Sequence, residues 1–123
     1  MIDERIALNL DDMKRAAEEA ISFVAGVTEQ DFLESPQRQK ACAMCLIIVS
    51  ESAARIEQSS PDFVAAHDDW PWKDIRGMRN VIVHDYARLH LPRVWLTVRT
   101  SLPDLLSRIE ALGELDPRLW PKR

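Results

Sequence analysis

The sequence has little glycine or cysteine and no long apolar stretch. It contains three glycines and two cysteines in 123 residues, and so few glycines disfavour a sheet protein, which needs many tight turns. The longest apolar run, Ala41 to Val49, is far too short to span a membrane. The first residues are acidic where a secretory signal peptide would be basic. We therefore expect a cytoplasmic protein with no membrane partner.

Patterns that bind metals or cofactors are also missing. The two cysteines form the segment Cys42-Ala-Met-Cys45, but a zinc site needs about four ligands, and no second cysteine or histidine pair exists. The Glu-x-x-His pairs of di-metal helical bundles do not occur either. We expect both cysteines to be buried in the core, and neither a metal nor a cofactor to be bound.

Charge is distributed unevenly along the chain, although the net charge of −4 at first argues against a nucleic-acid partner. Residues 1–34 carry nine acids and three bases, whereas residues 73–99 carry six bases and two acids. A basic zone of this kind within an acidic protein can hold phosphate groups. The alternative is an ordinary solvated helix face with scattered charges.

Apolar residues recur at steps of three and four, which is the spacing of amphipathic helices. The pattern predicts four long helices at about residues 3–24, 37–58, 71–87 and 92–113. Short helices are expected after Thr28, which forms a capping box with Asp31, and after Pro61. The length suits a single domain, residues 1–123. The predicted fold class is all-α, an antiparallel up-and-down bundle of four long helices plus short helices.

Several residues of these helices carry specific structural expectations. The second long helix should be the most buried, because Ala41, Met44 and Ile48 widen its apolar line. Pro103 should kink the fourth, since proline lacks an amide donor and clashes with the preceding turn. The core candidates of the third are Trp72, Ile75, Met78, Ile82 and Val83. The tail from Asp116 to Arg123 is either docked through Trp120 or mobile.

The third long helix also carries the most informative polar residues. On an ideal helix Arg79 and Tyr86 lie within about 20° of each other, whereas Arg79 and His84 lie about 140° apart. One ideal helix therefore does not point Arg79 and His84 at one phosphate. Either the helix loosens between them, or two copies face each other across a two-fold axis and build a composite cleft, which we favour. From spacing alone, an ion-paired arginine and a satisfied histidine explain the same residues.

The segment Trp72-Lys-Asp-Ile-Arg-Gly-Met-Arg-Asn-Val-Ile-Val-His-Asp-Tyr86 resembles the hallmark helix of the HepT-like toxins, which belong to the HEPN group of helical RNA-cutting domains. The family pattern is an arginine, four variable residues, a histidine, one further residue and a tyrosine. Arg79, His84 and Tyr86 match this pattern, and the usual asparagine is present as Asn80. Helix order and lengths are similar over nearly the whole chain.

This resemblance implies a fold, an activity and partners. The fold would be an up-and-down bundle that forms a homodimer through the motif helices. The activity would be metal-independent endonucleolytic cutting of RNA, such as tRNA or mRNA. The protein would be the toxin of a type VII-like pair, beside an MntA-type minimal nucleotidyltransferase antitoxin. In pairs of this kind the antitoxin transfers AMP to the motif tyrosine, which maps to Tyr86, and so silences the toxin.

The motif residues can support such chemistry. RNA carries its own nucleophile, the 2′-hydroxyl, so cutting needs only a proton-transfer group and a charge stabiliser. We assign His84 as general base or acid, and Arg79 as the residue that holds the phosphate and stabilises its developing charge. Asn80, one turn before His84, would orient His84 or the substrate. The remaining candidates for RNA binding are Arg76, Lys73 and Arg88.

The main alternative is a non-catalytic scaffold. In that interpretation the same helices form a dimer that binds a nucleotidyltransferase, and the motif serves as a docking surface. The two interpretations share one fold and differ in whether Arg79 and His84 act on RNA.

Overall fold

Helices make up nearly all of the described chain, which comprises residues 2–84 and 86–115 of a computed structural model, with side chains as far as residue 113. No strand occurs among these residues, so the predicted all-α class is confirmed. The elements are α1 (Glu4–Phe23), α2 (Glu29–Leu33), α3 (Pro36–Ser59), α4 (Pro61–Ala66), α5 (Trp72–His84), a 3-10 turn (Tyr86–Arg88), α6 (Leu91–Leu96), a π-helical turn (Thr97–Ser101) and α7 (Leu102–Leu115). None of the described helices is long and apolar enough to cross a membrane.

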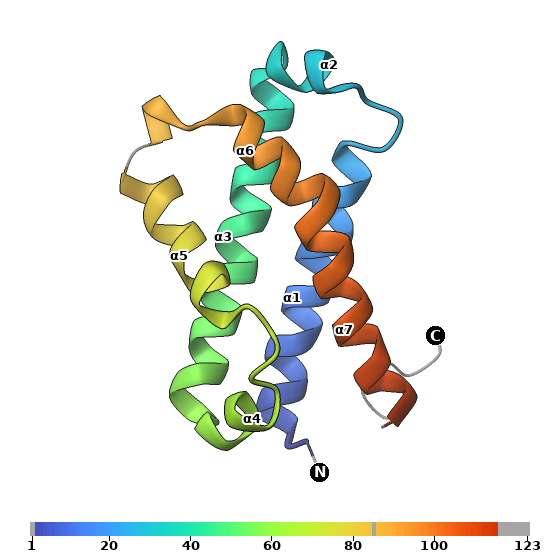
Figure 1. Ribbon diagram of the computed structural model, residues 1–123, viewed down its shortest axis with the longest axis vertical. Helices are drawn as coiled ribbons and strands as arrows, with labels where there is room; N and C mark the ends of the chain where they lie inside the picture. The colour runs from blue at the N-terminus through green and yellow to red at the C-terminus, as the bar shows by residue number, and fades with distance from the viewer. Residues whose placement is uncertain (1, 85, 116–123) are drawn as a thin grey trace.

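The long helices alternate in direction around α3, which is the middle of the bundle (Figure 1). α1 packs along one side of α3 and α5 along another, and α7 lies against α1. α6 and α2 meet at one end of α3. The buried side chains form one apolar cluster, whose fully enclosed members include Leu10, Met13, Val49, Ile56, Val98 and Ile109.

The starts of the helices follow from local sequence. The side chain of Asp3 accepts a hydrogen bond from the amide of Ile6 at 2.9 Å, which caps α1. Thr28 and Asp31 form the predicted capping box at the start of α2. Between these helices Gly26 has a φ of 70°, a conformation that side-chain-bearing residues rarely adopt.

Some side chains predicted to be buried are exposed instead. Met44 and Ile48 of α3 are 57% and 38% exposed, and Val83 of α5 is 48% exposed. Met78 is half-buried. The error has a physical cause: a helical repeat shows which residues share a face, but a neighbouring element has to cover that face. No described element covers the part of α3 that bears Met44 and Ile48.

The disturbance expected from Pro103 takes the form of a π-helical turn immediately before it. In this turn the amide of Leu102 donates to the carbonyl of Thr97, five residues back rather than four. The wider turn makes room for the proline ring, which would otherwise clash with the preceding carbonyl. The apolar face of the segment stays continuous, because Val98 and Leu102 are both buried.

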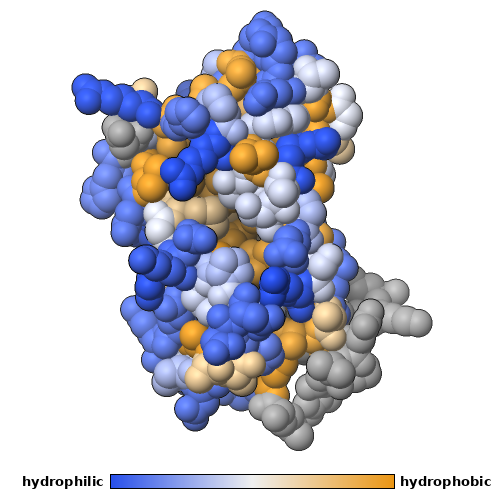
Figure 2. Space-filling model, in the orientation of Figure 1, coloured by the Kyte–Doolittle hydropathy of each residue, from blue (hydrophilic) through white to orange (hydrophobic). Residues whose placement is uncertain are grey.

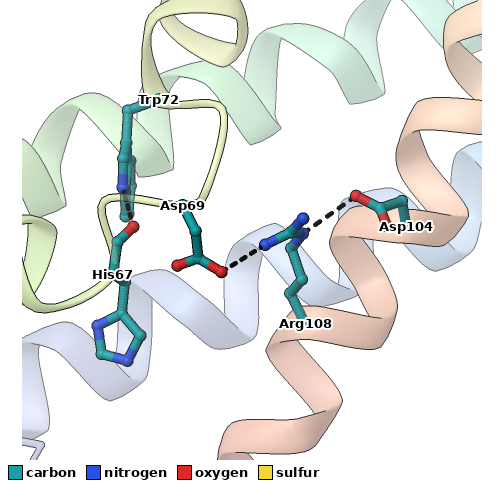
Figure 3. Close-up of polar contacts among 5 residues, drawn as sticks. All are labelled: His67, Asp69, Trp72, Asp104 and Arg108. Carbon is teal, nitrogen blue, oxygen red and sulfur yellow. Dashed lines mark hydrogen bonds and ion pairs between the residues drawn. The ribbon is translucent and has the colours of Figure 1, made fainter.

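The start of α5 is fixed by contacts from two directions (Figure 3). The indole of Trp72 donates a hydrogen bond to the carbonyl of His67 at 2.9 Å. Arg108 of α7 donates to Asp69 at 2.9 Å and to Asp104 at 3.1 Å. These bonds join the segment before α5 to Trp72, the first residue of α5, and to Arg108 on α7.

The visible face of the molecule is mainly hydrophilic in Figure 2, and hydrophobic residues show through in small areas. The tail from Asp116 to Arg123, with Trp120, lies outside the described residues.

Two leucines on α1 provide a matched test of this core. Leu10 is fully buried, whereas Leu8 is 62% exposed. We expect Leu10→Ala to lower the free energy of unfolding by about 2–5 kcal/mol, because it leaves a cavity. Leu8→Ala should change it by less than about 0.5 kcal/mol. Urea unfolding followed by circular dichroism measures both, and equal losses would contradict this packing.

Candidate functional site

The motif residues lie on α5, a helix with one buried stripe. Trp72, Ile75 and Ile82 form this stripe and are each at most 7% exposed. α3 is the long helix on which α5 packs most extensively. The hydroxyl of Ser50 on α3 donates to the backbone carbonyl of Arg76 on α5 at 3.2 Å. This packing fixes the rotation of α5 about its own axis, and with it the direction of every other side chain on the helix.

α5 ends at His84, three residues before the end predicted from the sequence. Tyr86 begins a separate 3-10 turn. The angle of about 20° between Arg79 and Tyr86 assumed one α-helix through residue 87, whereas Tyr86 belongs to a 3-10 turn. Asp85, between the two elements, lies outside the described residues.

Arg79 lies at the seam between α5 and α3, where it meets Glu51. Its Nε donates to Glu51 Oε1 at 3.0 Å, and both side chains are partly exposed, at 45% and 41%. The second oxygen of Glu51 is 3.7 Å from the guanidinium of Arg55, one turn further along α3. The contact matches the ion-paired arginine that spacing alone also allowed, and it leaves part of the guanidinium in solvent.

Arg76 makes a second ion pair of the same kind. Its Nη1 lies 2.7 Å from Oε2 of Glu57, which also comes from α3. The other two candidates for RNA binding are placed differently. Lys73 is exposed near the start of α5, and Arg88 is exposed in the 3-10 turn. Within the described part of the chain, neither has a hydrogen-bonded or ion-paired partner.

Asn80 and His84 occupy the outer side of α5, and both are exposed. They are four residues apart and so lie one above the other on the helix. α5 is a regular helix from Arg79 to His84, so the loosening considered from the sequence does not occur there. The two side chains leave the helix about 140° apart. A single copy therefore does not turn Arg79 and His84 toward the same point.

Tyr86 is 41% exposed at the first position of the 3-10 turn. A phenol in this position is accessible to another protein. It stands at the same end of α5 as His84, since only Asp85 separates the two residues.

Glu51 and Glu57, which pair with Arg79 and Arg76, were not predicted as site residues from the sequence. Both belong to the long α3, where nothing local distinguishes them from other surface acids. Their ion pairs with the arginines of α5 form only when α3 and α5 pack in a definite register. No local pattern in the sequence indicates that register directly.

The two cysteines are buried in the core, as predicted. Burial raises the pKa of Cys42 to about 11. Burial and the nearby Glu19 carboxylate raise the pKa of Cys45 to about 12. Thiolates, which bind metals and react with disulfides, are thus disfavoured at neutral pH. Among the residues that the structure describes, no group of three or more histidine, cysteine, aspartate or glutamate side chains could hold a metal ion.

An all-helical bundle with Arg79, Asn80 and His84 on one helix and Tyr86 just beyond its end has the architecture expected of a HEPN-type domain. A family model described as "Ribonuclease HepT-like" matches residues 13–112. The chain belongs to the HepT-like ribonuclease family.

Curated proteins from other organisms show the same relationship. A protein of Caldanaerobacter subterraneus subsp. tengcongensis named "Putative RNase" is 26% identical over 103 residues, which cover 84% of this chain and 89% of that protein. A protein of Thermococcus cleftensis named "Probable ribonuclease HepT" is 29% identical over 103 residues. These residues cover 84% of this chain and 91% of that protein. No solved structure gives a significant match.

Proposed function

We propose that the protein is the toxin of a type VII-like toxin–antitoxin pair, a metal-independent endoribonuclease that acts on tRNA or mRNA in the cytoplasm. The observation that carries this proposal is the exposure of Arg79 and His84 on one motif helix in a member of a ribonuclease family. Here each keeps hydrogen-bonding capacity that solvent or a substrate can use.

The reaction uses the 2′-hydroxyl of the RNA as its nucleophile. His84 takes the proton from this hydroxyl as its oxygen attacks the adjacent phosphorus. The 5′-oxygen of the next nucleotide leaves and takes a proton from water. The products are a 2′,3′-cyclic phosphate and a 5′-hydroxyl. Arg79 binds the phosphate and stabilises the negative charge on its equatorial oxygens, so no metal is required.

The residues around this pair support binding and orientation. Asn80 stands one turn before His84 and can donate to or accept from either the imidazole or the RNA. Lys73, Arg76 and Arg88 extend the positive charge in both directions along the helix. Contacts of this kind act on the phosphate backbone and would not by themselves select a sequence.

A homodimer completes the site in this proposal. Because Arg79 and His84 diverge on one helix, Arg79 of one copy and His84 of a second copy would act on the same linkage across a two-fold axis. The apolar surface needed for such contact is present next to Arg79. Met44, Ile48 and Val83 are large, apolar and exposed. The antiparallel register that pairs Arg79 with Glu51 places Val83 at the level of Met44 and Ile48.

Tyr86 is the proposed point of control. An MntA-type nucleotidyltransferase antitoxin would transfer AMP from ATP to the exposed phenol, with release of pyrophosphate. The added phosphate carries negative charge close to His84 and to the basic residues of α5. The adduct would therefore exclude RNA both by its bulk and by charge repulsion.

The first test is cutting of tRNA and mRNA by purified protein in EDTA. We expect wild-type protein to cut, Arg79→Ala to lose about 10²–10³-fold in rate, and His84→Ala about 10²–10⁴-fold. Arg15→Ala, which removes an exposed arginine of α1 paired with Asp11, serves as control. Products are identified by their cyclic phosphate ends. Equal behaviour of all four proteins would leave only the non-catalytic scaffold.

The composite site is tested by mixing two inactive variants. Arg79→Ala and His84→Ala are unfolded together, refolded and assayed, so that mixed dimers form. If each site takes its arginine from one copy and its histidine from the other, the mixture should recover about a quarter of wild-type activity, since about half of the dimers are mixed and each then holds one intact site. A mixture as inactive as its components would contradict a site shared between copies.

Control through Tyr86 is tested in cells. We expect Tyr86→Phe to remain toxic but to escape silencing when the nucleotidyltransferase is co-expressed, because the phenolic oxygen that accepts AMP is gone. Mass spectrometry of the wild-type protein from the same cells should show the mass of one AMP on the peptide that contains Tyr86. An unmodified tyrosine in a silenced wild-type toxin would rule out this mode of control.

A further inference from the structure

Glu51 contacts Arg79 in a way that leaves the reactive part of the guanidinium open. A guanidinium has two edges on which an oxyanion can form paired contacts: the side edge that includes Nε, and the end edge formed by the two Nη atoms. Glu51 Oε1 accepts from Nε at 3.0 Å. The side-chain hydrogen bond of Arg79 to a described residue is made through Nε and not through the two Nη atoms. The end edge therefore remains free for a phosphate while Glu51 holds the side edge.

The backbone of Glu51 is anchored in the bundle, and a second arginine lies near its carboxylate. Glu51 is part of α3, the most central helix of the bundle, and its neighbours Ser50 and Ser52 are at most 1% exposed. Arg55 lies 3.7 Å from the second oxygen of Glu51. The group of Arg79, Glu51 and Arg55 carries a net charge of +1, so it still attracts a phosphate.

We propose that Glu51 is a positioning residue that fixes the guanidinium of Arg79 for contact with the RNA phosphate. This inference rests on the proposed ribonuclease activity and adds a residue from α3 to a site otherwise built from α5. Arginine has many rotamers, and holding the group beforehand removes an ordering cost from the reaction. Glu51 does not touch the RNA and acts only through Arg79.

A competing explanation of the Glu51–Arg79 contact predicts a different effect of removing Glu51 on the cutting rate at saturation. If Glu51 were only a counter-ion that competes with RNA for Arg79, its removal would tighten RNA binding and raise or preserve the rate. If it positions Arg79, its removal also adds net positive charge and keeps or tightens RNA binding, but the rate at saturation falls. The rate and the binding constant therefore have to be measured separately.

The experiment is single-turnover cutting of labelled tRNA with excess protein over a range of concentrations. We expect Glu51→Ala to lower the saturating rate constant by about 10- to 100-fold, with a half-saturating concentration equal to or below that of wild type. Glu51→Gln should recover most of the rate, because its amide oxygen can still accept from Nε. Glu18→Ala, which removes an ion-paired carboxylate of α1, should match wild type.

A second readout follows the Arg79 contact directly. In a ¹⁵N NMR spectrum of the arginine side chains, the Nε–H signal of Arg79 should shift in Glu51→Ala and return toward the wild-type position in Glu51→Gln. Thermal unfolding of each variant confirms that the folded state is retained. An unchanged Arg79 signal, or an unchanged or raised saturating rate in Glu51→Ala, would overturn the positioning role while wild type still cuts RNA. A wild type that does not cut RNA would instead refute the ribonuclease proposal, and the positioning role with it.

Discussion

The candidate site depends on the burial of one face of α5 against α3. α5 has 13 residues, and an isolated helix of this length is only marginally stable in water. Trp72, Ile75 and Ile82 supply the apolar area that keeps it folded on the bundle. Once this face is fixed, the helical repeat determines where every other side chain points. Arg79 is left at the seam with α3, and His84 on the outer side.

The ion pairs at this seam matter more for geometry than for stability. Partly exposed pairs such as Arg79 with Glu51 contribute little to the free energy of folding, because water screens both charges. They do restrict two long arginines that would otherwise sample many rotamers. Arg76 with Glu57 is held in the same way. The carboxylates of α3 thus reduce the positive charge of α5 and order its cations at the same time.

The parts of the structure that depend on local chemistry could be predicted from the sequence. The helices follow from their apolar repeat, the start of α2 from Thr28 and Asp31, and the distortion before α7 from Pro103. The motif helix and its family could be recognised from a single segment. The parts that depend on distant neighbours could not. The end of α5 before Tyr86 and the contact of Glu51 with Arg79 depend on how whole helices pack, which a repeat along one helix does not encode.

The errors in the predicted core also have a common location. The helical spacing predicts Met44, Ile48 and Val83 in the interior, yet all three are exposed on α3 and α5, the two helices that meet at Arg79. Apolar side chains exposed on the outer face of a helix are unfavourable in an isolated bundle unless another surface covers them. The proposed second copy would cover them and would bring its own His84 toward Arg79 at the same time. One arrangement would then account both for side chains that one copy leaves in water and for the two proposed catalytic groups that one helix holds apart.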